Sequence, residues 1–311
     1  MIKLITHTDL DGVSCYLIAS YFYGKKAIDV EYVNYKNVDE TIINVIKEHN
    51  NYDYIYITDI SCNEETAKML DTIKYKVKLL DHHKTALYLN EYEWGCVKLR
   101  DTFGSIEVNS SGSQMFFMHL HRKFKINEKS HEIDNYASLV KYIEYVRKYD
   151  TWDWFKLEEI EPKKFNDLFR VLGRDRFIKN IEEKLFNNSM EFTELDNLLL
   201  DIVDEKKEKY LNDKKDLLIE TTLEFNDKLY NVGIVAAEDY ISELGNYLST
   251  EFPNLDFVAI ITPNSISYRT SKEDVDLSLI AQLKGGGGHT KASGSPLDKT
   301  LRDKFLIELI K

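Results

Sequence analysis

The chemically richest stretch of this chain is Asp81, His82 and His83, three polar residues that directly follow an apolar run at residues 77–80. That run predicts a short buried strand, so the triplet would stand at the strand's carboxyl end. Ligands bind at that edge of open α/β sheets. A polar turn explains the triplet alone equally well, so its interpretation depends on the rest of the chain.

A second group lies near the start of the chain. His7, Asp9 and Asp11 lie between a strand predicted for residues 2–5 and a helix predicted for residues 13–23. Two carboxylates and an imidazole at this spacing can converge on a cation, because oxygen ligands suit Mg²⁺ or Mn²⁺ and imidazole adds a preference for Mn²⁺. The alternative is a helix start in which Asp11 is the cap and Asp9 is solvated.

Two more carboxylates are candidate ligands. Asp59 directly follows residues 54–58, which predict a third strand, and Asp150 follows a helix predicted for residues 136–148. Asp153 is a rival to Asp150, because the residues between them leave the register open. Three strand ends thus carry acids or imidazoles, which a shared metal centre explains better than chance does.

Strands and helices alternate through the first half of the chain. A further strand is predicted for residues 30–35, and helices for residues 39–49 and, after a capping box at residues 61–64, up to residue 70. An outer strand is expected at residues 97–100. This alternation predicts an α/β fold with a mainly parallel sheet flanked by helices.

A hydroxyl-rich turn at residues 110–113 precedes a helix predicted for residues 114–120. Free backbone N–H groups at a helix start could hold a phosphate. Plain capping by a serine is the favoured interpretation.

The pattern changes near residue 187. Residues 195–218 have apolar residues at helical spacing among many charges, which predicts a long exposed helix. We therefore expect a first domain at residues 1–186, a helical linker at residues 187–225 and a smaller α/β domain at residues 226–311.

A glycine run dominates the last domain. Gly285 to Gly288 precede His289, and the small residues at 290–294 predict a helix start. Consecutive glycines expose backbone N–H groups that can form an anion nest; a flexible linker is the alternative. Arg269 follows a predicted strand and could clamp a phosphate or stack on a base. The candidate substrate-binding residues are Arg269, Ser271, Gly286, Gly287, Gly288 and His289.

Composition limits the classes of function. The chain has 311 residues and a net charge of −12, which argues against a protein that coats long duplex nucleic acid. Its three cysteines form no CxxC pair and predict reduced thiols in a cytoplasmic protein. We expect neither a signal peptide nor a membrane span.

Together these motifs resemble the DHH phosphoesterase family, and specifically its nanoRNase and 3′-phosphoadenosine-5′-phosphate phosphatase branch. The resemblance covers nearly the whole chain in the right order. The matching motifs are His7 to Gly12, Asp59, Asp81-His82-His83, Asp150, and the glycine run with His289 and Arg269, which is similar to the family's associated C-terminal domain.

The resemblance implies a pair of Mn²⁺ ions, with Mg²⁺ as the alternative. Asp59 would bridge the two ions. The further ligands would be Asp9, Asp11, His82 and Asp150, with His7 left open because it lies two residues before Asp9, whereas many members have four.

Two residues of the triplet have other implied roles. Asp81 would orient a neighbouring group, and His83 would donate to the scissile phosphate. The C-terminal domain would bind the rest of the substrate.

The expected activity is a metal-dependent phosphodiesterase or exonuclease that hydrolyses short single-stranded oligonucleotides or small nucleotides. The alternatives are a cyclic or linear dinucleotide phosphodiesterase, a phosphatase or pyrophosphatase, and a nucleotide-binding sensor without activity. No membrane partner is expected, and a homodimer is left open.

Overall fold

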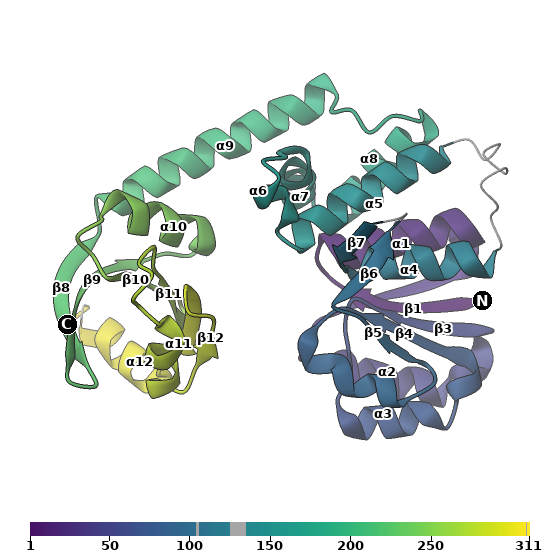
Figure 1. The fold of residues 1–311 in the computed structure, drawn as a ribbon, viewed down its shortest axis with the longest axis horizontal. Helices are drawn as coiled ribbons and strands as arrows, with labels where there is room; N and C mark the ends of the chain where they lie inside the picture. Colours follow the sequence, from purple (N-terminus) through teal and green to yellow (C-terminus); the bar gives the residue numbers. More distant parts are fainter. Residues whose placement is uncertain (104–105, 125–134, 309) are drawn as a thin grey trace. The chain divides into compact units, whose positions relative to one another are not determined.

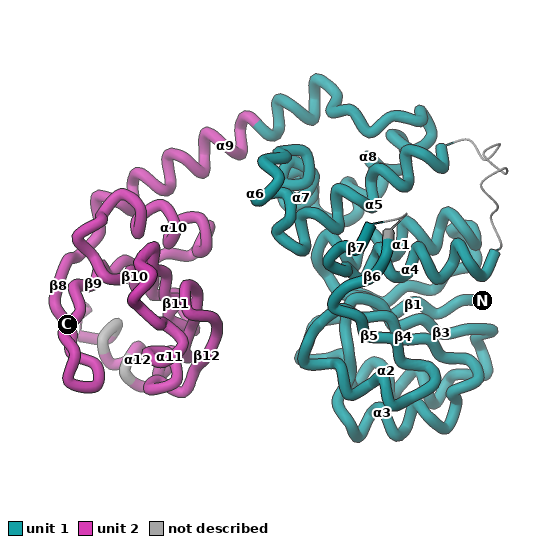
Figure 2. The backbone as a smooth tube through the Cα atoms, viewed as in Figure 1, with its two compact units in different colours: residues 1–200 teal, residues 201–311 magenta. Residues whose placement is uncertain are grey.

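The computed structural model describes residues 1–103, 106–124, 135–308 and 310–311. The chain divides into two compact units, residues 1–200 and 201–311 (Figure 2). The predicted domain division stays a prediction. Within the described residues, no helix is long and apolar enough to cross a membrane.

The first unit is built on a five-stranded sheet with the order β2-β1-β3-β4-β5, in which all neighbours are parallel. This confirms the predicted α/β class with a parallel sheet. The strands are β1 Ile2–His7, β2 Ile28–Val33, β3 Tyr54–Thr58, β4 Val77–Asp81 and β5 Gly95–Val97. The outer strand predicted at residues 97–100 is wrong by two to three residues, because Leu79 pairs with Gly95 and Asp81 with Val97.

Helices cover both faces of this sheet (Figure 1). α1 Leu10–Tyr23, α4 Gly112–Lys123 and α5 Tyr136–Asp150 pack on one side, and α2 Val38–Lys47 and α3 Glu64–Asp71 on the other. The remaining helices of this unit are α6 Asp153–Lys156, α7 Glu161–Leu172 and α8 Arg174–Phe186. Short 3₁₀ segments lie at Lys25–Ala27, His49–Asn51, Lys74–Lys76 and Lys84–Glu91, and a hairpin joins β6 Arg100–Phe103 to β7 Ile106–Asn109.

Alternation along the strands explains the two faces. Leu4 and Tyr56 contribute to a first core with α1, α4 and α5, whereas their neighbours Ile5 and Ile57 contribute to a second core with α2 and α3. Successive side chains of a strand point to opposite faces, so apolar residues in a row are needed when both faces are covered.

The start of α3 corrects a local prediction. Asn63 is its N-cap, and its side-chain oxygen accepts a hydrogen bond from the Thr66 amide at 2.9 Å. The capping box predicted from Ser61 to Glu64 is therefore wrong, because the helix begins at Glu64 itself.

The second unit holds a six-stranded mixed sheet with the order β12-β13-β11-β10-β9-β8. Its strands are β8 Ile219–Phe225, β9 Lys228–Ala236, β10 Phe257–Ile261, β11 Ser265–Arg269, β12 Gly287–Gly288 and β13 Ala292–Pro296. Its helices are α10 Ile241–Glu251, α11 Leu277–Leu283 and α12 Lys299–Glu308, and α9 Glu194–Lys215 runs across the boundary between the units.

Two predictions for this region are wrong. Residues 219–225, placed in the helical linker, form β8, which pairs with β9 along its whole length. The small residues around 290–294 begin no helix; Ala292 to Pro296 pair with β11 instead.

Candidate metal centre

The candidate site lies where neighbouring strands of the parallel sheet end. β1 and β3 are adjacent, but α1 packs into the first core and α3 into the second, so the chain leaves these strands toward opposite faces. Open α/β sheets bind ligands at such a switch point. His7 ends β1, Asp81 ends β4, and Asp59 directly follows β3. The structure thus brings the sequence candidates to one edge.

Asp59 stands at the centre of this edge and is almost fully buried, with 1% of its surface exposed. Its backbone has a left-handed φ of 57°, which aspartate tolerates better than most residues. Gly112 begins α4 against it, and a Cβ there would lie 2.4 Å from the Asp59 Cβ. Burial raises the pKa of Asp59 well above its usual range, and the carboxylates of Asp11 and Asp9 raise it further.

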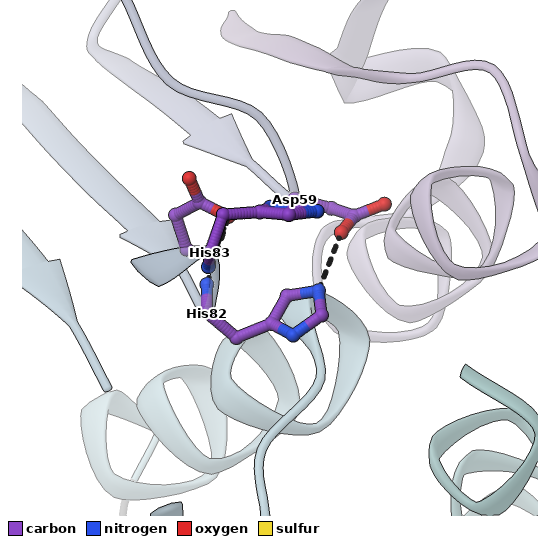
Figure 3. Close-up of side chains that lie close together, drawn as sticks. Asp59, His82 and His83 are labelled. Carbon is purple, nitrogen blue, oxygen red and sulfur yellow. Dashed lines mark hydrogen bonds and ion pairs between the residues drawn. The ribbon is translucent and has the colours of Figure 1, made fainter. Parts of the chain in front are cut away.

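The His82 ring points to the Asp59 carboxylate (Figure 3). His82 Nε2 lies 3.3 Å from Asp59 Oδ1 and 3.3 Å from Asp150 Oδ2. Burial lowers the pKa of His82, which favours the neutral imidazole that binds metals. Burial also raises the pKa of Asp150 well above its usual range, and repulsion from the Asp11 carboxylate raises it further.

Several polar atoms of this cluster are buried and make no hydrogen bond. Among the described residues, His82 Nε2, Asp59 Oδ2 and Asp150 Oδ2 make no hydrogen bond. Buried polar atoms are normally hydrogen-bonded, so these ligand atoms, together with the likewise unbonded Asp81 Oδ2, require an explanation. A divalent cation fits this donor set, because carboxylate oxygens and imidazole nitrogen are its usual protein ligands.

Asp9 and His7 form one side of the cluster. Asp9 is the N-cap of α1, with Oδ1 accepting from the Gly12 amide at 3.0 Å, so the alternative in which Asp11 is the cap is wrong. Asp9 Oδ2 lies 2.8 Å from His7 Nδ1, and that nitrogen lies 3.9 Å from Asp59 Oδ2. Only glycine fits at position 12, because a Cβ would lie 2.3 Å from the His7 carbonyl oxygen.

Asp11 is held by the start of α4. Its Oδ2 accepts from the Gly112 amide at 2.6 Å, and its Oδ1 accepts from the Ser113 amide at 3.1 Å and from the Ser113 hydroxyl. Ser111 caps α4 through the Gln114 amide at 3.3 Å. The hydroxyl-rich turn therefore both caps the helix, as favoured, and binds a carboxylate of the protein itself.

Asp81 and His83 form a hydrogen-bonded pair. Asp81 Oδ1 accepts from His83 Nδ1 at 2.7 Å and from the His82 amide at 2.8 Å. The bond to Asp81 raises the pKa of His83 against the opposing effect of burial. Burial alone would raise the pKa of Asp81, but the bond from His83 lowers it below its usual range.

Tyr35 is a site residue that the sequence interpretation missed. It lies just after β2, with its hydroxyl 3.3 Å from His83 Nε2 and its ring centroid 5.4 Å from that of His7. Its side chain is 57% exposed. The sequence interpretation placed Tyr35 inside a strand at residues 30–35, but β2 ends at Val33, which leaves Tyr35 beyond the strand end.

The structure separates Asp150 from its rival. Asp153 Oδ2 accepts from Arg147 Nη1 at 2.7 Å, and its Oδ1 accepts from Asn109 Nδ2 at 3.0 Å. Asp150, the last residue of α5, lies beside His82. Asp150 therefore joins the cluster and Asp153 does not.

Ligand atoms within 4.8 Å of one another form three overlapping groups. These are Asp59, Asp81, His82 and His83; His7, Asp9 and Asp59; and Asp11, His82 and Asp150. Asp59 and His82 each belong to two of these groups. A carboxylate such as Asp59 has two oxygens and can therefore be shared by two ions.

Comparison with known proteins identifies the family of this chain. No protein-family model matches the chain. The chain is 37% identical to oligoribonuclease NrnB of Bacillus subtilis (strain 168) over 320 residues, which cover 99% of this chain and 76% of NrnB. This chain belongs to the DHH phosphoesterase family.

Solved structures share the fold of this DHH phosphoesterase. PggH, a pGpG-specific phosphodiesterase from Vibrio cholerae, matches with a TM-score of 0.53 and 13% identity over 100% of this chain and 98% of PggH. RecJ from Thermus thermophilus, in complex with Mn²⁺, matches with a TM-score of 0.50 and 13% identity over 98% of this chain and 51% of RecJ. At such identity the likeness shows the fold alone.

The C-terminal candidates of this DHH phosphoesterase lie in the second unit. Arg269 Nη1 donates to the Tyr268 carbonyl at 2.9 Å, and its Nη2 donates to Ser242 Oγ at 3.1 Å. The Ser271 hydroxyl donates to the Ser249 carbonyl at 2.9 Å. Arg269 and Ser271 are thus both anchored to α10.

The glycine run differs from the predicted nest of free N–H groups. The Gly286 amide donates to the Ala281 carbonyl at 2.8 Å, and the His289 amide donates to the Ala292 carbonyl at 2.8 Å. Gly287 and Gly288 pair with β13. A Cβ at Gly286 would lie 2.0 Å from the Gly294 carbonyl oxygen, so close approach to β13 requires glycine there.

Proposed function

We propose that this chain is a divalent-metal-dependent phosphodiesterase that removes nucleotides from short single-stranded oligonucleotides. The observation that carries the proposal is that Asp59, His82 and Asp150 bring buried ligand atoms together that make no hydrogen bond among the described residues. The full-length similarity to oligoribonuclease NrnB supports the substrate class.

We assign the metal ligands from this geometry. Asp59 would be shared by two cations, with Asp9 and His7 on one side. His82, 3.3 Å from both Asp59 and Asp150, would bind on the other side with Asp150 and Asp11. Bound cations would supply positive charge against the phosphate oxygens and a water acidified for attack. Mn²⁺ suits the mixed oxygen and imidazole donors, and Mg²⁺ is the alternative ion.

The remaining site residues would act on the substrate directly. Asp81 holds His83 by its Nδ1, which fixes the ring and keeps Nε2 directed away from Asp81. Because the pKa of His83 is raised, its imidazolium can donate from Nε2 to a phosphate oxygen. His83 is therefore the proposed donor to the scissile phosphate, and Asp81 is its positioning residue.

The second unit would contribute the rest of the substrate site. We keep Arg269, Ser271, Gly286, Gly287, Gly288 and His289 as its candidate residues. Arg269 is well suited to a phosphate or base, because a guanidinium half-buried against α10 has lost part of its freedom before binding.

The test is a substrate panel with the purified full chain. Protein treated with EDTA is supplied with Mn²⁺ or Mg²⁺ and incubated with labelled dinucleotides, 5-mers of RNA and DNA, cyclic dinucleotides, pyrophosphate and a long duplex. We expect metal-dependent release of mononucleotides from the 5-mers and dinucleotides and no cleavage of the duplex.

The other outcomes discriminate between the alternatives. Turnover of cyclic dinucleotides alone would replace the proposed substrate class, and turnover of pyrophosphate alone would make the chain a pyrophosphatase. Nucleotide binding without turnover of any substrate would reject the enzyme and favour a sensor.

A further inference from the structure

One cavity of the first unit lies apart from the candidate metal centre. It has a volume of about 210 Å³ and lies between α4 and the strands β4 and β5. Its apolar lining consists of Leu80, Cys96, Met115 and Met118, and its polar lining consists of Lys78, Lys98, Asp101, His119 and Arg122. This volume is many times what a single water needs.

The polar lining carries an excess of positive charge. Lys98 Nζ is paired with Asp101 Oδ2 at 3.1 Å, so these two charges offset each other. Within the described part of the chain, Lys78 and Arg122 have no carboxylate partner, and His119 Nε2 is buried without a hydrogen bond. In a chain with a net charge of −12, this is a local reversal of sign.

The pKa of His119 reflects the positive charge around the cavity. Burial, followed by repulsion from Lys78, Lys123 and Arg122, lowers its pKa to about 4. The ring is therefore neutral at physiological pH, and its buried nitrogen lies among cations that an anion would neutralise.

A larger cavity of about 430 Å³ between α1, β2 and α8 has a smaller excess, because Lys25, Arg174 and Lys179 face the carboxylates of Asp175 and Glu182. There Lys25 pairs with Glu182, and Arg174 bonds to Asp175 at 3.2 Å and lies 4.2 Å from the Tyr32 ring centroid. Two of its three cations are paired with carboxylates, so the smaller cavity has the larger excess of unpaired positive charge.

We propose that the cavity between α4 and the β4–β5 edge binds a phosphate group through Lys78, Arg122 and His119. Lys78 precedes Asp81 by three residues of β4, which places this site about 10 Å from the metal centre along the strand. Met115 and Met118 would carry an apolar part of the ligand, so a phosphate monoester with a base or sugar fits better than a bare anion.

Binding is measured by isothermal titration calorimetry with the full chain in EDTA, using wild type and the Asp59→Asn variant. The titrants are inorganic phosphate, adenosine 5′-monophosphate and a trinucleotide. We expect binding at this cavity with the same Kd in both proteins, because the metal-centre carboxylate plays no part in it.

The double variant Lys78→Gln/Arg122→Gln removes the two free cations and should weaken binding by about tenfold or more, since charge-assisted contacts to phosphate are lost. The control, Lys68→Gln/Arg176→Gln, removes the same charge from residues outside the cavity lining and should stay within about twofold of wild type. Circular dichroism melts compare the folding of all variants.

The titrants also identify the source of the phosphate. Equal affinity for phosphate and the monophosphate points to free phosphate, tighter monophosphate points to a mononucleotide, and tightest trinucleotide points to the substrate chain. No binding of any titrant, or equal losses in the double variant and the control, would overturn the proposal.

Asp101→Asn provides a second, independent test. It frees Lys98 and should tighten binding severalfold. If the double variant does not fold, unchanged affinity in Asp101→Asn rejects the site. Since no step uses catalysis, failure here is distinct from failure of the proposed activity.

Discussion

The candidate metal site of the first unit, called the metal edge below, lies at the strand ends that carry His7, Asp59 and Asp81. It and the glycine run of the second unit both carry residue types that suit ligands, but they differ in whether their buried polar atoms are hydrogen-bonded. At the metal edge, Asp59, His82 and Asp150 hold buried atoms that make no hydrogen bond among the described residues. In the glycine run, the amides of Gly286 and His289 are bonded within the unit. Unsatisfied buried atoms indicate a ligand, whereas satisfied ones are explained by the fold.

Among the variants considered, Asp59→Asn should cause the largest loss of activity. Loss of a shared ligand should lower kcat/KM by at least about 100-fold. Because burial raises the pKa of Asp59, its charge opposes folding of the metal-free protein, so the variant's melting temperature in EDTA should rise by a few degrees, about 2–4 °C per kcal/mol.

Mn²⁺ supplies the complementary measurement. At 100 times its Kd, an ion that binds only the folded state stabilises by about 2.7 kcal/mol, so wild type should melt higher with Mn²⁺ and Asp59→Asn should not. Asp153→Asn is the matched control for activity, since Arg147 holds that carboxylate outside the cluster. Wild-type rates in Asp59→Asn would remove the metal model.

Asp196→Asn tests the opposite case, a buried carboxylate whose oxygens are hydrogen-bonded within the protein. Asp196 Oδ2 accepts from Lys184 Nζ at 2.6 Å and from the Thr193 amide at 2.9 Å, and its Oδ1 accepts from Asn180. Breaking the pair should cost about 3–5 kcal/mol, because Lys184 stays buried without its counter-charge. Thermal melts with Asp213→Asn as an exposed control test this.

The pH dependence of Asp196 has a defined sign. Burial alone would raise its pKa, but the bonds from Lys184 and Thr193 lower it below the ordinary value of 3.8. Its contribution to stability is therefore present above pH 3.8 and is lost as the pH falls through the folded pKa. The gap between wild type and Asp196→Asn should shrink over that acidic range; a constant gap would contradict this assignment.

The glycine run offers a paired test of smaller size. A Cβ at Gly286 would lie 2.0 Å from a carbonyl oxygen, whereas one at Gly287 would meet no atom within 4 Å. Gly286→Ala should therefore cost about 1–3 kcal/mol and Gly287→Ala less than about 0.5 kcal/mol in denaturant unfolding. A raised KM in a fully folded Gly287→Ala would show that the run also binds substrate.

The sequence predicted the metal edge because parallel strands end together. An apolar run followed by Asp59 or Asp81 marks both the strand and its end, and the βαβ pattern places those ends at one edge. The pattern could not assign individual atoms. Asp11 and Asp9 look equivalent in sequence, yet Asp11 is held by Gly112 and Ser113, which are about a hundred residues away.

Other errors arose where pairing outweighs local pattern. β8 is largely exposed, so its residues lack the alternation of a half-buried strand, and only its register with β9, Ile219 opposite Ile234, defines it. The choice of Asp150 over Asp153 was no error, but the sequence could not decide it, because it depends on Arg147 and Asn109, which hold Asp153. Neither contact leaves a periodic signal.

Tyr35→Phe should give the smallest effect and tests the outer side of the metal edge. The Tyr35 hydroxyl is the described partner of His83 Nε2, at 3.3 Å. Burial, followed by repulsion from Asp81, raises the pKa of Tyr35 to about 12, so the hydroxyl remains a donor. If His83 meets the scissile phosphate, that hydroxyl lies within reach of the same oxygens.

Its loss should raise KM about threefold to tenfold and leave kcat unchanged, as removal of one hydrogen bond made equally in the bound and transition states would. Tyr75→Phe, at an exposed tyrosine on the 3₁₀ segment before β4, is the control and should change neither constant. A lower KM in Tyr35→Phe would mean that the hydroxyl competes with substrate for His83. The phosphate would then have to displace the Tyr35 hydroxyl from His83 Nε2, and that nitrogen would be hydrogen-bonded in the substrate-free enzyme.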